Sequence, residues 1–511
     1  MKTTARFPDT FRLLILCTFL YYLWMAAQIP YAHDDLYWGT ETGIRYLMDG
    51  SQNSRYAGNL IVLTLTRFPL VKTAVMGAVF TAVPLAMVCF VLRCMAYAPE
   101  SDEARRLRPT LFIAANVPIL LMPSLVWTQS YGWVSGFSNY TVSGLLLILY
   151  FLLVLRIEDG DRLSGLPVFL FGAVIQLFLE NLSVYFFLAS LFLVLRRRLK
   201  RQKVGKALLL LLAGNLLGLI LVFGNGLYVT LWNTGSAVGN YRRLSFDKNA
   251  GALSVLLRLL SLSYYDMLPH LLNYSGILPA AILGVLLLRG LRCLLAREGS
   301  RAALLCLGLL HVLLLCYYLY CFLYVRYGLK CAPFQRLEDV DGSILHLLYL
   351  LLVTFDLLVF FPKEPRYRFW LLCLWASPLL IIAPLTAVNT VFPRSFVTSD
   401  LCCTLFFLLL LAPLLAGWSL PLQRAAAAMF AAAFLLFAWH YGRIYAEIGS
   451  VNRERLALIR EARRGERDTI CFPAFPHNGY LMPTDFPPSD STYRAFYGIP
   501  EDVAFTFASE E

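Results

Sequence analysis

The sequence has few charged residues for its length. Only 15% of its 511 residues are Asp, Glu, Lys or Arg, whereas 59% are hydrophobic and the mean hydropathy is +0.64. Apolar runs of about 20 residues recur along the chain, and each is long enough to cross a hydrocarbon core of about 30 Å as a helix. One soluble core cannot account for so many runs. The composition therefore predicts an all-α polytopic membrane protein.

The cysteines and the basic residues lack the patterns of two other protein classes. The 12 cysteines show no disulfide-type or zinc-type spacing, and most of them stand inside apolar segments, where a thiol simply packs. The formal net charge is +12, but Lys and Arg form short clusters between apolar runs and no continuous stripe. We therefore expect the lipid bilayer as a partner, and no nucleic acid.

Four clusters of Lys and Arg set the predicted topology, because cytoplasmic loops carry the excess of these residues. The clusters lie at 93–108, 196–203, 289–301 and 363–368. Pairing the apolar runs between them gives about thirteen crossings. The predicted spans are 11–30, 70–93, 109–127, 140–156, 166–179, 182–196, 204–224, 274–292, 302–325, 344–361, 369–388, 398–420 and 424–445.

The first apolar run follows Lys2, Arg6 and Arg12, so we expect it to be a retained anchor with the N-terminus in the cytoplasm. The odd number of crossings then places the C-terminus outside. The expected organisation is a multi-spanning domain, 1–445, followed by a small extracytoplasmic C-terminal region, 446–511. Three segments on the outer side, 34–48, 56–67 and 251–272, are amphipathic at helical spacing. We expect them to lie along the interface and to cover a cleft in which a lipid-borne substrate would dock.

Two adjacent aspartates, Asp34 and Asp35, follow His33 directly after the first apolar run. Two carboxylates at a membrane exit are costly to desolvate, which suggests a site that takes a proton or holds a cation. The alternative is that they cap the start of a helix and interact with its dipole. Capping needs only one aspartate, so we favour the chemical role, with which capping is compatible.

Other segments on the same side carry side chains suited to sugars and phosphates. Tyr131 and Trp133 could stack on a sugar ring, or could belong to an interfacial aromatic belt. Glu180 and Asn181 fall at the predicted outward turn between two short spans. Arginines are also present on the outer side, where they could bind phosphate oxygens in a bidentate manner or snorkel to lipid headgroups. They are Arg242, Arg243 and Arg394.

The arrangement resembles the glycosyltransferase C (GT-C) superfamily, whose members carry an acidic motif in the first external loop. It looks most like a bacterial branch related to O-antigen and wall-polymer glucosyltransferases. The residues that carry the resemblance are Pro30 to Asp35, Ser54 to Asn59, Tyr131 to Trp133, Glu180 and Asn181, Asn240 to Arg243, Phe392 to Arg394, and Phe496 to Ile499.

The resemblance implies a multi-pass protein of a bacterial inner (cytoplasmic) membrane. It also implies transfer of a sugar, with inversion, from a polyprenyl-phosphate-linked donor to a glycan acceptor of the cell envelope at the outer face. Asp34 or Asp35 would be the general base, and the other aspartate would orient it or hold a divalent ion, Mg or Mn. Glu180 would complete that metal site or bind sugar hydroxyls. The residues expected to bind the substrate or its phosphate are His33, Arg55, Tyr131, Trp133, Glu180, Asn181, Arg242, Arg243 and Arg394.

Two other classes stay open. A transporter or flippase of lipid-linked sugars would place charges in the middle of its spans, and here most span centres lack acids, with Asp356 as an exception. A ligase or polymerase of lipid-linked glycans would rely on arginine and histidine in a large external loop. The segment 225–273 has paired arginines and His270.

Overall fold

Long apolar helices form most of the protein, as the composition predicts. A computed structural model describes residues 10–98, 100–237, 242–295, 301–359, 365–389, 391–482 and 490–508. Within these residues, ten helical stretches are long and apolar enough to cross a membrane. They contain α1 (Thr10–Gln28), α5 (Pro69–Cys94), α8 to α9 (Val134–Glu158), α12 (Lys206–Phe223), α16 (Leu278–Leu295), α17 (Arg301–Tyr327), α18 (Ala332–Val359), α19 (Pro365–Ile382), α20 (Val397–Ala416) and α21 (Leu420–Arg463).

The other three predicted spans are also helical, but they are shorter or more charged than those ten. They correspond to α6 (Asp102–Leu120), α10 (Gly165–Ile175) and α11 (Glu180–Leu199). The 11 residues of α10 rise about 16 Å, which is roughly half of a hydrocarbon core. Acidic residues occupy the first turn of α6, and arginines occupy the last turn of α11. Length and composition alone therefore support about ten crossings.

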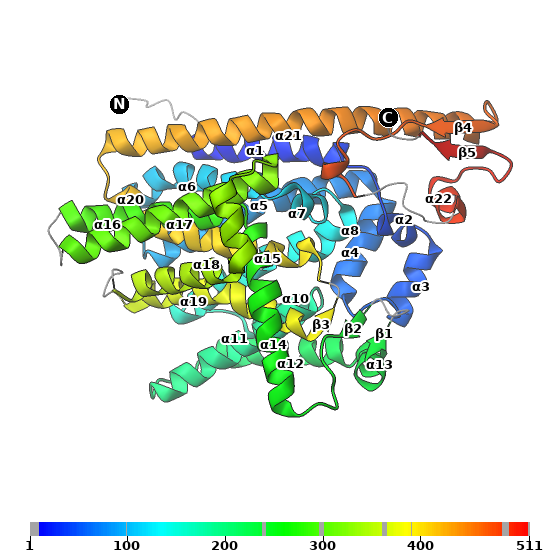
Figure 1. Ribbon diagram of the computed structural model, residues 1–511. Coiled ribbons are helices and arrows are strands. Elements are labelled where there is room, and N and C mark those ends of the chain that lie inside the picture. The colour runs from blue at the N-terminus through cyan, green and yellow to red at the C-terminus, as the bar shows by residue number, and fades with distance from the viewer. Residues whose placement is uncertain are drawn as a thin grey trace, which may run out of the picture.

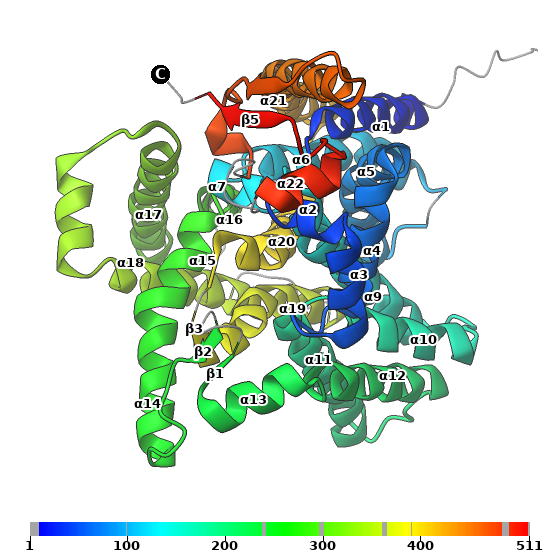
Figure 2. The same ribbon diagram turned by 90° about the vertical axis from the view of Figure 1, so that its right-hand side faces the viewer.

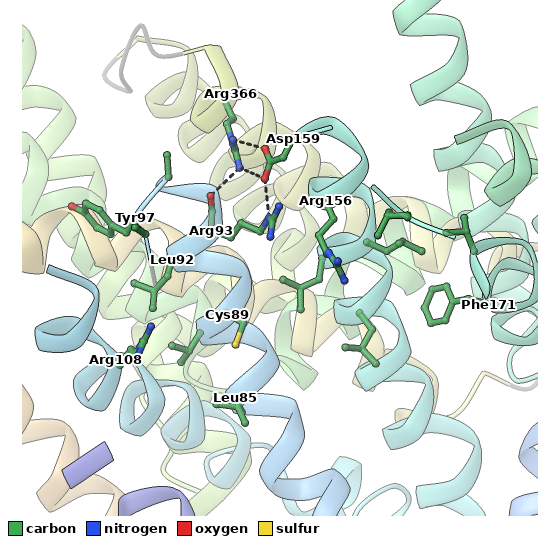
Figure 3. A pocket seen from close by; sticks show the side chains of 18 of the residues that line it. Leu85, Cys89, Leu92, Arg93, Tyr97, Arg108, Arg156, Asp159, Phe171 and Arg366 are labelled. Atoms are coloured by element: carbon green, nitrogen blue, oxygen red, sulfur yellow. Dashed lines mark hydrogen bonds and ion pairs between the residues drawn. The ribbon is translucent and has the colours of Figure 1, made fainter. Parts of the chain in front are cut away.

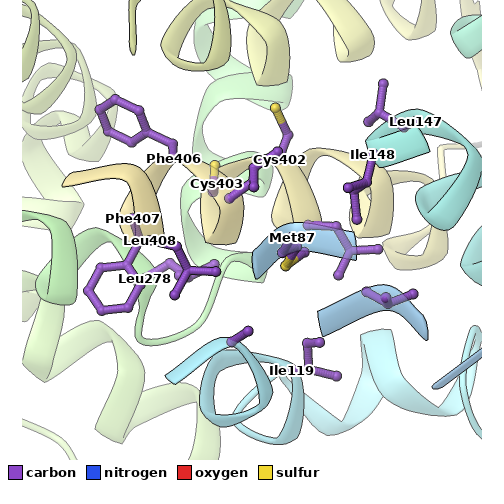
Figure 4. Close-up of a cluster of buried hydrophobic side chains, with 14 of the residues drawn as sticks. Met87, Ile119, Leu147, Ile148, Leu278, Cys402, Cys403, Phe406, Phe407 and Leu408 are labelled. Atoms are coloured by element: carbon purple, nitrogen blue, oxygen red, sulfur yellow. The ribbon is translucent and has the colours of Figure 1, made fainter. Parts of the chain in front are cut away.

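Helix α20 lies at the centre of the bundle and is buried along nearly its whole length. Side chains from four neighbouring helices surround it, among them Met87, Ile119, Ile148 and Leu278 (Figure 4). A helix that is apolar all round is stable only when it is covered on every side. This position explains why the segment 398–420 shows no amphipathic pattern.

Three of the four basic clusters meet at one end of the bundle. Arg93 forms an ion pair of 2.8 Å with Asp159, and Arg366 approaches the same carboxylate to 2.6 Å. Arg196 pairs with Glu158 at 3.0 Å. The clusters that the sequence assigned to one side of the membrane are thus adjacent in space. This end lies at the left of Figure 1, and we call it the basic end.

Short helices and a small sheet gather at the opposite end. All three segments expected to be amphipathic are largely helical. One of them contains α14 (Ala252–Leu262), which runs across the direction of α21 in both views (Figures 1 and 2), as a helix in the interface would. The short elements are α2 (Asp34–Trp38), α3 (Glu41–Asp49), α4 (Tyr56–Arg67), α7 (Ser124–Thr128), α8 (Val134–Gly136), η1 (Phe137–Thr141), α13 (Gly226–Thr234), α14 (Ala252–Leu262), η2 (Ser263–Met267), α15 (Leu268–Tyr274), η3 (Ala383–Ala387) and η4 (Pro393–Phe396). From η1 the chain continues into the long helix α9 (Val142–Glu158), which ends at the basic end. The sheet has the antiparallel order β1 (Ser236–Ala237), β2 (Arg242–Leu244), β3 (Val388–Asn389).

The C-terminal region is continuous with the membrane domain. The expected boundary at 445 falls inside α21, which continues to Arg463. Beyond it, β4 (Thr469–Phe472) pairs in parallel with β5 (Ala504–Phe507), and η5 (Asn478–Tyr480) and α22 (Asp490–Tyr497) lie between them in the chain. Leu36 of α2 belongs to the hydrophobic cluster of this region. Strand β5 and the start of α1 lie at opposite ends of the bundle (Figure 1).

The positions of the two ends predict opposite labelling of two exposed residues, Lys203 and Asp502. In a chain whose native cysteines are replaced, Lys203→Cys and Asp502→Cys will differ in their reaction with a membrane-impermeant maleimide in intact spheroplasts. One of the two will react only after permeabilisation, because the bilayer separates them. Equal reaction of both without permeabilisation would contradict the arrangement of the helices.

Candidate functional site

The two adjacent aspartates lie in different surroundings. The Asp35 side chain is fully buried. Its Oδ2 accepts a hydrogen bond from the Ala32 N–H at 3.1 Å, and its Oδ1 accepts from the Ser135 N–H at 2.8 Å and from the Ser135 hydroxyl. The Asp34 side chain is 46% exposed. Asp35 therefore joins α2 to α8, and Asp34 is the accessible carboxyl group.

Burial raises the pKa of Asp35 to about 7, because a carboxylate loses its hydration inside the protein. The hydrogen bonds from Ser135 and Ala32 act in the opposite direction, and the charge of Asp34 adds slightly to the increase. Asp35 is thus strongly perturbed, but its oxygens are already engaged by the protein.

Asp34 is held by its neighbour. The Nδ1 atom of His33 lies 2.8 Å from the Oδ1 atom of Asp34, and the imidazole meets the Trp133 ring edge to face at 5.7 Å. Burial lowers the pKa of His33, but the hydrogen bond and charge of Asp34 outweigh it, so the net pKa is raised. His33 has a φ of 50°, a conformation that costs energy for a residue with a Cβ. The turn that joins α1 to α2 imposes this conformation.

The capping hypothesis holds only in part. The N-cap position of α2 is His33, and its side chain makes no capping hydrogen bond. Asp34 and Asp35 stand in the first turn, where a negative charge interacts favourably with the helix dipole. Asp35 directs Oδ2 backward to the Ala32 N–H. Neither aspartate is therefore needed as the N-cap.

Two arginines from distant parts of the chain meet at Tyr140. Arg394 Nε donates to the Tyr140 hydroxyl at 3.2 Å, and Arg55 Nη1 donates to the same oxygen at 3.0 Å. The Arg394 guanidinium also lies 5.5 Å from the centre of the Trp133 ring. Trp133 in turn donates through Nε1 to the Ala32 carbonyl at 3.0 Å. Trp133 therefore contacts both the turn that carries Asp34 and the guanidinium group of Arg394.

Arg55 continues the chain of contacts to Glu180. Its Nε and Nη2 atoms lie 3.0 and 2.9 Å from Oε2 of Glu180, and both side chains are mostly buried. The Tyr228 hydroxyl donates to the other carboxylate oxygen of Glu180 at 2.6 Å. We call the connected set the polar network. Its members are His33, Asp34, Trp133, Arg394, Tyr140, Arg55, Glu180 and Tyr228.

Not all residues expected at the site belong to the polar network. Tyr131 is buried in the core, where it stacks on Trp127 at 4.8 Å. The Asn181 amide donates to the Ile381 carbonyl at 3.1 Å and so holds α11 against α19. Arg243 lies in β2 opposite Ser236 and Asn389. The side chain of Arg242 lies outside the described residues.

Two residues of this region were missed in the sequence. Ser135 binds Asp35, and Tyr228 binds Glu180. Ser135 stands two positions after Trp133. A small hydroxyl side chain so close to the predicted aromatic site was the signal by which it could have been found. Tyr228 stands just after a Gly-Asn-Gly turn in an apolar helix, and nothing in its local sequence indicates that it contacts Glu180.

The acidic side chains expected to hold a metal do not form a complete site. Asp35 and Glu180 accept hydrogen bonds from protein donors, and Glu180 is neutralised by Arg55. No group of three or more His, Cys, Asp or Glu side chains placed for metal binding occurs in the part of the chain that the structure describes. Because divalent ions need several oxygen ligands, these residues do not fit a protein-held ion. Chemistry at this site is therefore assigned to its side chains and not to a metal ion.

Asp356, the acid expected within a span, is buried between α18 and α17. Its Oδ2 atom lies 2.6 Å from Nε2 of His311, whose Nδ1 contacts the Leu307 carbonyl. A second buried acid, Asp400 in α20, accepts a hydrogen bond from Ser275 at 2.7 Å. Buried acids inside a membrane need such partners.

Comparison of the chain with protein-family models, curated protein sequences and solved structures found no match.

A double-mutant cycle will measure the coupling free energy between Arg55 and Glu180, the buried ion pair of the polar network. Glu180→Gln leaves the Arg55 charge buried without its counter-ion, so we expect a loss of about 3 kcal/mol and a lower unfolding temperature in detergent. Arg55→Gln/Glu180→Gln will lose less than the sum of the single variants.

The matched control is the exposed pair Arg105 and Glu100, whose side chains are 61% and 86% exposed. The same cycle on that pair will show no measurable coupling. Additive losses at Arg55 and Glu180 would contradict the buried contact.

The pKa of Asp35 predicts a pH dependence of stability. The folded pKa of about 7 exceeds the ordinary value of 3.8, so the folded state holds this proton more tightly than the unfolded state. The stability contributed by the proton is complete below pH 4 and is lost as the pH rises to about 7. The unfolding temperature of the wild type minus that of Asp35→Asn will therefore fall from pH 5 to pH 7 and level off above.

Asp34→Asn is the control for this titration, because it leaves Asp35 able to titrate. The unfolding temperature of Asp34→Asn minus that of Asp35→Asn will show the same fall from pH 5 to pH 7. A difference curve for Asp35→Asn that is flat or rising between pH 5 and pH 7 would show that Asp35 is not buried in this way.

Proposed function

We propose that this protein is an integral membrane glycosyltransferase. It moves a sugar from a polyprenyl-phosphate-linked donor to a cell-envelope glycan on the outer face of a bacterial inner membrane. The observation that carries the proposal is that one accessible carboxyl group, Asp34, and one guanidinium group, Arg394, are gathered at the same tryptophan, Trp133. Such a pair serves a reaction that removes a proton and releases a phosphate.

The proposed reaction gives Asp34 and Arg394 separate roles. The Asp34 carboxylate takes the proton of the acceptor hydroxyl while that oxygen forms a bond to the anomeric carbon of the sugar. The bond from the anomeric carbon to the phosphate oxygen breaks, and its electron pair leaves with the polyprenyl phosphate. His33, hydrogen-bonded to Asp34, orients the carboxylate. The GT-C resemblance implies inversion at the anomeric carbon.

Arg394 is the group proposed to neutralise the leaving phosphate, because an arginine can bind two phosphate oxygens at once. Its guanidinium group rests on the faces of Trp133 and Phe392 and is tied to Tyr140. These contacts fix its position before a substrate arrives. Arg55 is held by Glu180, so its part is to position Tyr140 and, through it, Arg394.

The proposed orientation follows from the two ends of the bundle. Arginine clusters crowd the basic end, which the positive-inside rule places in the cytoplasm. The polar network, α14 and the C-terminal strands then lie outside. Thirteen crossings, with α6, α10 and α11 counted as spans, agree with termini on opposite sides of the membrane. This orientation places Asp34 on the outer face, where the GT-C resemblance expects an acidic motif.

A ligase or polymerase of lipid-linked glycans is the second candidate. The His270 ring stacks on Phe396 at 6.0 Å, and Phe396 belongs to the same short helix η4 as Arg394. A histidine is thus available beside the phosphate-binding arginine. A ligase would transfer a whole glycan, whereas a glycosyltransferase adds a single sugar. A transporter finds less support, because the Asp356 and His311 pair lies between α17 and α18, away from the elements that form the polar network.

Mass analysis of envelope glycans from wild-type and deletion cells tests the proposal. The deletion will remove one sugar residue from an envelope glycan. Asp34→Asn will fail to restore it, with activity lowered by about 10²-fold to 10⁴-fold, as for loss of a general base. Asp49→Asn removes an exposed acid of α3 at the same end and will restore the glycan fully.

The mass change distinguishes the candidates. Loss of an entire polymer would favour the ligase or polymerase, and unchanged glycans in the deletion would refute both. Restoration by Asp34→Asn at the wild-type level would show that Asp34 is not the base.

A further inference from the structure

Two cavities open between helices toward the basic end of the bundle. The larger, of about 920 Å³, has ion pairs at its rim, where Arg93 and Arg366 are engaged by the carboxylate of Asp159 (Figure 3). The smaller, of about 280 Å³, lies between α16, α17 and α18. Its lining includes the buried pair of His311 and Asp356, which the proposed reaction does not use.

His311 and Asp356 share one proton. The Nδ1 atom of His311 lies 2.8 Å from the Leu307 carbonyl oxygen, which can only accept a hydrogen bond, so Nδ1 carries a hydrogen. The Nε2 atom of His311 and the Oδ2 atom of Asp356 are 2.6 Å apart. A second hydrogen must lie between them, because two lone pairs at this distance would repel each other. Whether this hydrogen belongs to the ring or to the carboxyl group, the pair has no net charge.

One oxygen of this pair is left for a ligand. Oδ1 of Asp356 accepts no hydrogen bond from the residues that the structure describes. A buried carboxyl oxygen without a donor is costly. Apart from Arg289 and the pair itself, the lining residues are leucine, valine and glycine. A ligand that fits must therefore be mostly apolar and must bring one hydrogen-bond donor.

Two glycines keep the cavity open. A Cβ atom added at Gly290 of α16 would meet no neighbouring helix within 4 Å, and one added at Gly308 of α17 would approach only Leu287, at 4.0 Å. Both glycines line the cavity. Glycine weakens a helix relative to alanine, so helix stability does not explain them. Their effect is to leave space that larger side chains would fill.

The cavity can be entered from the bilayer. Leu291, Leu305, Leu309 and Val312 line it and are exposed, in helices that are apolar enough to cross the membrane. A lipid-soluble molecule can therefore enter sideways without passing through water. The volume is just below the range of about 300–1,000 Å³ typical of ligand sites. It suits a molecule with one hydrocarbon chain better than a lipid with two acyl chains.

We propose that this cavity binds a neutral lipid alcohol with a single chain. The hydroxyl group donates a hydrogen bond to Oδ1 of Asp356, and the chain lies against the leucines of α16 and α17. A neutral donor suits a pair that is already neutral, whereas an ammonium group would bring an unbalanced charge between apolar walls. An ionised phosphate would present oxygen lone pairs to Oδ1. The site is independent of the polar network and of the proposed reaction.

Photolabelling of the full chain in lipid nanodiscs tests this site. The probe is dodecanol with a diazirine group in the middle of its chain, and the labelled peptides are identified by mass spectrometry. We expect one label per chain, within residues 286–294 or 304–312. Unlabelled dodecanol will compete about tenfold better than dodecane, dodecylamine or dodecyl phosphate, the difference that one hydrogen bond to a carboxyl oxygen makes.

Three variants separate the cavity from general effects on the fold. Gly290→Leu fills the cavity, leaves its polar groups in place and will lower labelling about tenfold. Gly284→Leu is the matched control, because Gly284 also has open space at its Cβ position in α16 but does not line the cavity. It will leave labelling unchanged. Both changes favour the helix, so neither is expected to unfold it. Asp356→Leu will reduce the competition by dodecanol to that of dodecane.

Three results would overturn the proposal. They are labels spread over all lipid-facing helices, equal competition by dodecanol and dodecane, and equal effects of Gly290→Leu and Gly284→Leu. Stronger competition by dodecylamine than by dodecanol would also overturn it, because the ligand would then be a cation.

Discussion

The buried carboxyl group of Asp35 is the contact on which the candidate site depends. It joins the turn after α1 to the start of α8 through Ala32 and Ser135. An isolated carboxylate in the interior would be very costly, and these three hydrogen bonds make its burial tolerable. The same junction is closed from the other side by Trp133, which donates to the Ala32 carbonyl. Asp35 therefore fixes the surface on which Asp34 is presented.

The second constraint is the separation of charge between the two ends of the bundle. At the basic end, arginines are partly neutralised by Asp159, Asp161 and Glu158, and they hold three loops together. At the opposite end, Arg55 and Arg394 are both tied to the Tyr140 hydroxyl, and Arg55 is also paired with Glu180. The central helix α20, which is apolar along most of its buried length and carries the buried Asp400 in its first turn, lies between the two ends. The ion pairs of the basic end are therefore separated from the polar network by the apolar bundle.

The sequence predicted the parts of the fold that depend on local composition. The apolar runs, the amphipathic segment that became α4, and the turn before Glu180 all follow from periodicity and length. The difference between Asp34 and Asp35 could not be predicted. Neighbouring helical residues point about 100° apart, and Asp35 is the buried one because Ser135, 100 positions later, meets it.

The same limit applies to the site. Arg55 and Glu180 are 125 positions apart, so no local pattern could show that they neutralise each other. Because of this pairing the proposed function gives Arg55 a positioning role, whereas the role of both residues in substrate binding stays a prediction. Tyr131 and Trp133 are two positions apart and both aromatic, yet one stacks inside the core and the other contacts His33 and Arg394. Composition identifies such residues as candidates for the site, but only the tertiary contacts show whether each one lies in the core or in the polar network.

The central claim is that Asp34 and Arg394 act together on a lipid-phosphate sugar. Its most direct test is the release of polyprenyl phosphate by purified protein in lipid nanodiscs. The reaction contains a polyprenyl-phosphate hexose and glycan extracted from the envelope of deletion cells. The account predicts release that requires the extract and is lost in both Asp34→Asn and Arg394→Gln. Release that is absent with wild-type protein, or unchanged in both variants, would contradict it.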